Sequence, residues 1–226
     1  MKKRIFSLFL GACLVLLVLL STASCTKTSK MNDAILALNG CNKLDLSLYS
    51  LTTVHVGSQD EEYMQKQEFT RDGKSQELFT TFNSYSQTVL ANSGEKSAKD
   101  GIKNEAIDYD DYLTSPDYLG YINGLLKAVP AYCLKEARFD SVGKKQTMSV
   151  NLTGEDFAFA YSELDKIFAS KLVSLEGEEK PIEYNGCELK IVTRQGYLAE
   201  IYLKVNAECG FTSAEFKFNL VCNSYS

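Results

Sequence analysis

The sequence of 226 residues contains no tryptophan and only one histidine, His55. The lack of tryptophan disfavours a carbohydrate-binding module. A single histidine in a strand-like segment is typical of a surface or packing residue, even with Asp60 and Glu61 in the turn that follows. The Gly-x-Ser-x-Gly motif of serine hydrolases is also absent. The sequence therefore predicts no catalytic site, and we expect a protein that is not an enzyme.

The cysteines form no Cys-x-x-Cys pair, which disfavours zinc sites and thioredoxin-type redox sites. An odd number of cysteines follows the first 25 residues, so at least one of them lacks a partner within the chain. Exported proteins can form disulfides, and the sequence leaves the pairing open. We interpret most of these cysteines as small buried hydrophobic residues: Cys41, Cys133, Cys187, Cys209 and Cys222.

The most acidic short segment, Asp108 to Tyr112, invites comparison with a calcium site because calcium binds several carboxylates. It lacks the glycine and the distal bidentate glutamate that such loops usually contain. We read it as a solvated loop, whose tyrosines, with Tyr118 and Tyr121, could instead stack on sugars or on a protein partner. No metal and no cofactor is expected.

The first 24 residues have the three parts of a secretory signal. Lys2, Lys3 and Arg4 form a basic start, an apolar run of 16 residues follows from Ile5 to Leu20, and small residues close the segment. A transmembrane anchor needs roughly 20 apolar residues, and no basic cluster follows this run closely. The pattern therefore predicts export of the chain.

The segment Thr22-Ala23-Ser24-Cys25 resembles the lipobox of bacterial lipoproteins, in which small residues precede a lipidated cysteine. Thr22 stands where that family usually has leucine. A second candidate, Leu10-Gly11-Ala12-Cys13, matches better by letter but would leave the apolar segment from Leu14 to Leu20 on the mature chain. The resemblance implies that Cys25 is lipidated, the alternative being ordinary cleavage after Ser24. Two acyl chains would anchor the chain firmly.

Removal of residues 1–24 would take away three of the 24 basic residues and none of the 29 acidic ones, leaving 202 residues with a net charge of −8. A chain this acidic is a poor partner for nucleic acid or for anionic lipid surfaces. We expect residues 25–30 to be a lipidated cysteine with a short polar tether, and residues 31–226 to form a single domain.

Segments with a period of two predict strands with one buried face. Asp72-Gly73 and Gln195-Gly196 are typical of tight turns between such strands, which makes consecutive strands antiparallel. Residues 92–106 are predicted to form a loop. The strands are expected at residues 44–49, 63–70, 74–83, 133–139, 146–152, 188–193, 197–206 and 214–220.

Three segments have a helical pattern. A short helix is expected at residues 31–38, and a second between Ser115, as the cap, and Pro130. A third begins at Thr153, which resembles a capping-box residue, and runs to Lys171. The apolar residues of this third helix, including Phe157, Leu164 and Phe168, should pack on the sheet. The fold class is therefore α+β: an antiparallel sheet with helices on one side.

The order of these elements resembles the LolA/LppX-like lipoproteins, as do the helix start at Asn151-Leu152-Thr153-Gly154-Glu155 and the meander around residues 192–198. The resemblance implies a curved sheet, an open half-barrel, with helices packed on its concave face around an apolar groove for lipid or acyl chains. It transfers no ligand-binding side chain to this chain.

The expected function is that of a bacterial extracytoplasmic lipoprotein that is anchored to the cell membrane and binds or handles a lipid or other hydrophobic ligand. The alternative is a surface lipoprotein that acts as a non-catalytic module for a protein or cell-wall partner. The volume of any apolar cavity should separate the two, because ligand sites typically measure about 300–1,000 Å³.

Overall fold

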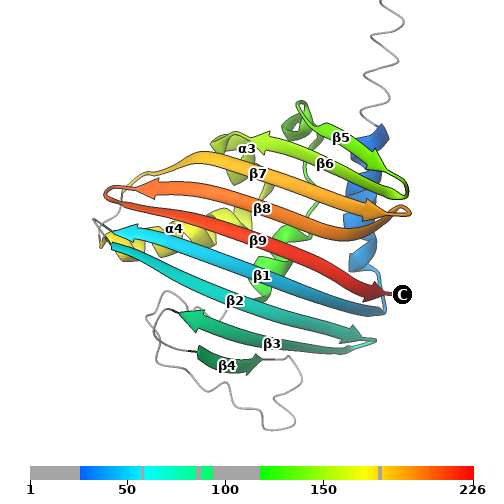
Figure 1. Ribbon diagram of the computed structural model, residues 1–226, viewed down its shortest axis with the longest axis horizontal. Helices are drawn as coiled ribbons and strands as arrows, with labels where there is room; N and C mark the ends of the chain where they lie inside the picture. Colours follow the sequence, from blue (N-terminus) through cyan, green and yellow to red (C-terminus); the bar gives the residue numbers. More distant parts are fainter. Residues whose placement is uncertain (1–25, 57–58, 85–87, 94–117, 178–179) are drawn as a thin grey trace, which may run out of the picture.

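The computed structural model describes residues 26–56, 59–84, 88–93, 118–177 and 180–226. The strands of these residues form one sheet of nine strands in the order β4-β3-β2-β1-β9-β8-β7-β6-β5 (Figure 1). All the neighbouring pairs are antiparallel. The strands are β1 Lys43–Val56, β2 Gln59–Asp72, β3 Ser75–Ser84, β4 Thr88–Ser93, β5 Arg138–Val142, β6 Lys145–Leu152, β7 Ile182–Arg194, β8 Tyr197–Cys209 and β9 Thr212–Tyr225.

The first and last long strands, β1 and β9, lie side by side at the centre of the sheet. Their pairing closes at the chain end, where Lys43 and Ser226 exchange two backbone hydrogen bonds of 3.0 and 3.1 Å. The other neighbouring strands follow one another along the chain. The β1–β9 pair therefore joins a hairpin series from the N-terminal part, β1 to β4, to a series from the C-terminal part, β5 to β9.

The helices lie together behind one face of the sheet (Figure 1). This arrangement confirms the predicted fold class, a curved antiparallel sheet with helices on its concave face. Helix α3 contacts β6 and β7, and α4 contacts β8 and β9. Residues 26–39 are helical, followed by α2 Tyr118–Leu125, the 3-10 helix η2 Ala131–Leu134, α3 Gly154–Ala160 and α4 Ser162–Glu176.

Several turn and burial predictions are confirmed. Gln195 and Gly196 have φ values of +56° and +86°, as a type I′ hairpin turn requires, and Gly73 has a φ of +61° in the turn between β2 and β3. Thr153 caps α3, since its hydroxyl oxygen accepts a hydrogen bond from the backbone N–H of Asp156 at 3.1 Å. The side chains predicted to pack on the sheet, Phe157, Leu164 and Phe168, are fully buried.

The helix predicted from Thr153 to Lys171 is two helices, which meet at Tyr161. The backbone of Tyr161, with φ −121° and ψ 43°, leaves the helical region, and its side chain is fully buried. Packing of the Tyr161 ring against Phe157, at 5.9 Å between centroids, accompanies this break. The apolar periodicity of the sequence continues through Tyr161, so this pattern could not predict the helix break.

The strand predicted at residues 133–139 is also wrong, because its first two residues belong to η2 and β5 starts only at Arg138. Likewise α2 ends at Leu125 instead of continuing to Val129. The side chain of Asn32 bonds both backbone groups of Val129, at 2.8 and 3.0 Å, which holds Val129 outside the helix. The proposed cap of this helix, Ser115 with Pro116, lies outside the described residues.

Residues 26–30, expected as a tether, belong to the N-terminal helix, and Thr28 is buried. The strand β4 was not predicted. Its last two residues fall in the expected loop at 92–106, and residues 94–106 lie outside the described part of the chain. These differences move element ends, divide one helix and add one strand, and the antiparallel sheet with helices on one face remains as predicted.

Candidate ligand site on the outer face of the sheet

The strands place alternate side chains on two different faces of the sheet. We call the face that carries the helices the inner face and the opposite one the outer face. In β9, Phe216 and Phe218 are buried on the inner face, whereas Lys217 and Asn219 lie half-buried on the outer face. The same alternation in β8 buries Leu203 and leaves Tyr202 half-buried on the outer face.

Aromatic rings fill the inner face where α3 and α4 cross β8 and β9. The ring of Phe168 stacks on Phe216 at 4.0 Å between centroids and on Phe218 at 5.6 Å. Phe157 adds a parallel ring 5.9 Å from Phe168. We predicted the lipid groove between the helices and this face. Here the space is occupied by packed aromatic side chains, as in a solid core.

The inner face over β2 is more polar. Gln65 and Gln67 are buried there. Closer to β9, helix α4 buries Lys171, whose ammonium lies 5.2 Å from the ring centroid of Tyr121, and this ring packs against Phe218 of β9. Burial lowers the pKa of Lys171 to about 8. A buried ammonium and buried amides need polar surroundings, so neither position suits an acyl chain.

The described residues form a hollow of about 400 Å³ on the outer face, at the centre of the sheet. Two rows of side chains across the strands make its floor. One row runs from Tyr202 through Asn219 and Tyr49 to Lys66, and the second consists of Lys217, Leu51 and Met64. The lining also includes Ser50, Gln65 and Phe218, which follow or precede these residues along their strands.

The hollow combines apolar side chains with the ammonium groups of Lys66 and Lys217. Tyr49 and Met64 are 47% and 53% exposed, which is unusual for large apolar side chains in a sheet centre. The ammonium of Lys66 lies 5.8 Å from the ring centroid of Tyr49, and that of Lys190 lies 5.2 Å from the centroid of Tyr202. These contacts hold the rings in place while leaving one side of Tyr49 open to solvent.

The lysines of the outer face alternate with carboxylates. Lys66 bonds Glu68 at 2.6 Å, and Glu215 lies between Lys204 and Lys217 and pairs with both. The hydrogen bond with Glu68 raises the pKa of Lys66. Burial acts to raise the pKa of Glu215, but the hydrogen bonds from Lys204 and Lys217 outweigh it and lower that pKa. Lys66 and Glu215 therefore stay charged near neutral pH.

The side-chain amide of Asn219 is a polar group in the floor of the hollow. Its Oδ1 atom is buried and has no hydrogen-bond partner among the described residues. A buried acceptor of this kind is normally satisfied in a folded protein by water or by a ligand.

A second hollow of about 510 Å³ adjoins the first and shares Leu51 and Lys217 with it. Its lining is polar and includes His55, Glu62 and Glu208. His55 therefore lies on the surface of the sheet, as its position in a strand predicted. Within the described part of the chain, no three His, Cys, Asp or Glu side chains are grouped closely enough to hold a metal ion.

Two sites considered from the sequence, Cys25 and the acidic segment 108–112, lie outside the described residues. The five cysteines among the described residues are all free thiols. Burial raises the pKa of Cys187 to about 12 and that of Cys222 to about 11, so these thiols stay protonated and unreactive near neutral pH. Cys133 and Cys209 are also buried, in keeping with a packing role.

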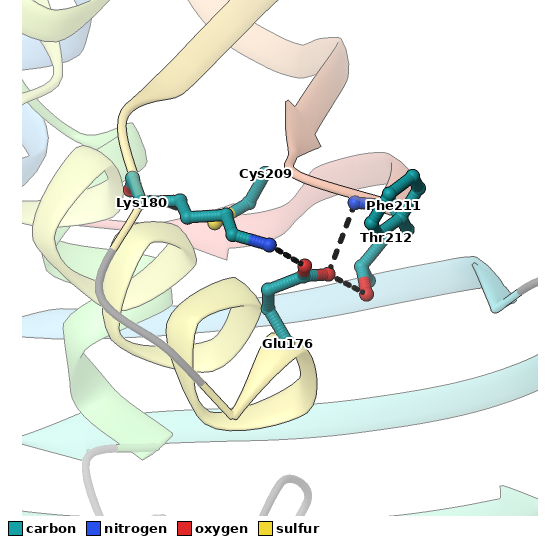
Figure 2. A network of polar contacts seen from close by, with 5 residues as sticks. All are labelled: Glu176, Lys180, Cys209, Phe211 and Thr212. Atoms are coloured by element: carbon teal, nitrogen blue, oxygen red, sulfur yellow. Dashed lines mark hydrogen bonds and ion pairs between the residues drawn. The ribbon is translucent and has the colours of Figure 1, made fainter.

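A polar cluster at one end of the sheet has a structural role (Figure 2). The Glu176 carboxylate, at the end of α4, accepts hydrogen bonds from Lys180 at 2.6 Å, the Thr212 hydroxyl at 2.9 Å and the Phe211 backbone N–H at 3.1 Å. These bonds fasten α4 to the turn between β8 and β9. Lys180 also closes over the ring of Phe211 at 5.1 Å. Figure 2 shows the Glu176 carboxylate pointing toward Lys180, Phe211 and Thr212.

No protein-family model and no curated protein matches the chain. Among solved structures, it is similar to LprF from Mycobacterium bovis, with 10% identity over 88% of this chain and 91% of that one, at a TM-score of 0.27. It is also similar to a DUF1329 family protein from Desulfovibrio piger, with 8% identity over 88% and 92% of the two chains, at a TM-score of 0.23. An inactive mutant of the CurK dehydratase has 12% identity over 80% and 77%, at a TM-score of 0.16.

These TM-scores are too low to transfer a fold or an activity. The description of the fold therefore rests on the strand pairing within this chain. Among the described residues, no helix is long and apolar enough to cross a membrane.

Proposed function

We propose that the chain is an exported bacterial lipoprotein, anchored to the membrane through a lipid on Cys25, that binds a lipid with an anionic head group. The observation that carries this proposal is the apolar hollow on the outer face. Its volume of about 400 Å³ lies in the range of small-molecule sites. Leu51 and Met64 offer apolar contact to an acyl chain, and Lys66 and Lys217 offer ammonium groups to a carboxylate or phosphate.

The ligand half of the proposal is tested by binding of palmitate and of hexadecanol, which differ only in the head group. We expect micromolar or better affinity for palmitate. Leu51→Glu places a carboxylate in the floor and should weaken both ligands about tenfold or more. Val142→Glu, at an exposed position in β5, is the matched control and should leave both affinities unchanged.

The Lys66→Gln variant tests the contribution of the head group to affinity separately from that of the acyl chain. An exposed ion pair contributes about 0.2–1 kcal/mol, so palmitate should bind up to about fivefold more weakly while hexadecanol is unaffected. If each ligand binds the parent, Leu51→Glu and Lys66→Gln proteins with the same affinity, the hollow is ruled out as the site.

The anchor half of the proposal is tested by Cys25→Ser in the producing cell. The variant should leave the membrane fraction, or accumulate as an unprocessed precursor, because no thiol is left to accept the lipid. A processed variant of unchanged mobility that still sediments with the membrane would refute lipidation at Cys25.

The second hollow supports a different candidate, a non-catalytic module that binds a protein or cell-wall partner. Its polar lining and its continuity with the exposed Tyr49 and Met64 make a surface wider than one acyl chain requires. This candidate predicts that neither palmitate nor hexadecanol binds, while substitutions at Glu62 and Glu208 reduce retention of the protein on cell envelopes.

A further inference from the structure

The N-terminal helix is already formed at Thr26, the residue after the proposed lipid site, and its described residues pack into the domain from Thr28 onward. Residue 26 is already helical, and Thr28, Met31 and Ile35 are buried. A lipid on Cys25 would therefore be followed by the folded domain with no extended tether between them. Such an attachment restricts how far the domain can move from the membrane surface.

Two contacts fix this helix against its neighbours. The ammonium of Lys27 lies 5.7 Å from the ring centroid of Phe139 in β5. Asn32 bonds Val129 through both of its amide atoms, six residues or about 9 Å of helix after residue 26. Figure 1 shows the start of this helix (blue) at the β5 edge of the sheet, the edge near which α3 also lies.

An exposed aromatic pair lies among the elements at this edge. Tyr132 in η2 and Phe159 in α3 are 47% and 64% exposed, and their ring centroids are 5.5 Å apart. Both η2 and α3 contact β6, the neighbour of β5, and Tyr132 follows Val129 by only three residues. The pair contributes little to the core, since the buried residues of α3 are Phe157 and Ala160.

We infer that Tyr132 and Phe159 insert into the interfacial layer of the membrane that holds the Cys25 lipid. This inference rests on the anchor in the proposed function and is independent of the ligand in the hollow. Aromatic side chains favour the boundary between head groups and acyl chains. An anchor so close to the folded domain brings the pair to the membrane surface at high effective concentration, so even a weak apolar contact is populated.

Charge is not the driving force for this contact. Basic residues at this edge, such as Lys27 and Arg138, are mixed with the acidic Glu136 and Glu155, and all four are exposed. Insertion of the pair should therefore depend on apolar contact and be insensitive to salt, unlike binding through a basic cluster.

The absence of tryptophan from the sequence allows a direct test. Phe159→Trp and, separately, Tyr132→Trp each introduce the only indole into the full-length protein, which is processed in its host and reconstituted into phosphatidylcholine vesicles. Phe211→Trp is the matched control, because Phe211 is 88% exposed in the β8–β9 turn, at the far end of the sheet from the N-terminal helix.

We expect brominated phosphatidylcholine to quench the indole emission of the Phe159→Trp and Tyr132→Trp variants, with a blue shift that persists in high salt, and to leave the control unquenched. Vesicle flotation is measured on the same samples. Protein that floats while the indoles of both variants remain unquenched would overturn the membrane contact and leave the anchor standing. Protein that does not float would refute the anchor, and the proposed contact would fall with it.

Discussion

The contact between Gly124 in α2 and Leu164 in α4 predicts a compensating pair of substitutions. A β-carbon added at Gly124 would lie 2.8 Å from both Cγ and Cδ2 of Leu164, closer than real contacts allow. Leu164 is fully buried, and its branch point cannot swing away freely. Gly124→Ala alone should therefore strain the interface between the two helices, although alanine favours the helix.

The magnitudes follow from the atoms that are added or removed. Leu164→Ala removes Cγ and Cδ2, which crowd position 124, together with Cδ1, and should lower the free energy of unfolding by about 2–5 kcal/mol. Gly124→Ala should cost about 1–3 kcal/mol through overpacking, offset by about 1 kcal/mol of helix propensity. In the double variant the clash is gone and the new methyl group fills part of the cavity. We expect a favourable coupling energy of about 1–3 kcal/mol.

Urea denaturation followed by circular dichroism measures all four proteins of this cycle, since the chain has no tryptophan for fluorescence. The double variant should be more stable than Leu164→Ala alone. Additive losses, with a coupling energy near zero, would show that α2 and α4 do not pack as described. Leu172→Ala is a useful control because its fully buried side chain lies two turns further along α4 and should not couple to Gly124.

Three further predictions concern single side chains. The bond with Lys180 lowers the pKa of Glu176 below its unfolded value, so its stabilisation is lost as pH falls through the folded pKa. In Glu176→Gln the free energy of unfolding should fall less steeply as the pH is lowered into the acid range. An unchanged dependence on acid pH would contradict this role of Glu176. Burial lowers the pKa of Lys171 to about 8, so stability should rise between about pH 8 and the unfolded lysine pKa, and Lys171→Met should abolish that rise in denaturation measured against pH. Thr153→Ala removes the cap of α3 and should cost about 0.5–2 kcal/mol in urea unfolding, whereas Thr153→Ser should cost little.

Local patterns were enough to predict the long strands of the sheet, but not β4 or the true start of β5. In β9, apolar residues such as Phe216 and Phe218 alternate with polar ones because only one face of the strand is buried. Gly73 provides the positive φ that the turn between β2 and β3 requires. The helix break at Tyr161 was not predictable in this way. It depends on the packing of a buried ring in the folded core, and the apolar spacing is the same on both sides.

The candidate site is a case in which a usable signal was overlooked. The alternation that buries Leu44, Leu46 and Leu48 in β1 places Leu51 on the outer face, beside Tyr49. Two large apolar side chains on the solvent side of a strand indicate a contact surface. Their partners Lys217 and Asn219 could not be found from the sequence, because no local pattern predicts that the first and last strands pair.

The position of the hollow links ligand binding to the slowest expected step of folding. Its floor joins Tyr49 and Leu51 of β1 to Lys217 and Asn219 of β9, so the site exists only after strands from the two ends of the chain have paired. Pairings of such long sequence separation form late and slowly. A ligand in the hollow binds only the paired sheet, and at about 100 times its Kd it would stabilise that state by about 2.7 kcal/mol. The ligand would thus act where the N-terminal and C-terminal halves of the sheet could otherwise separate.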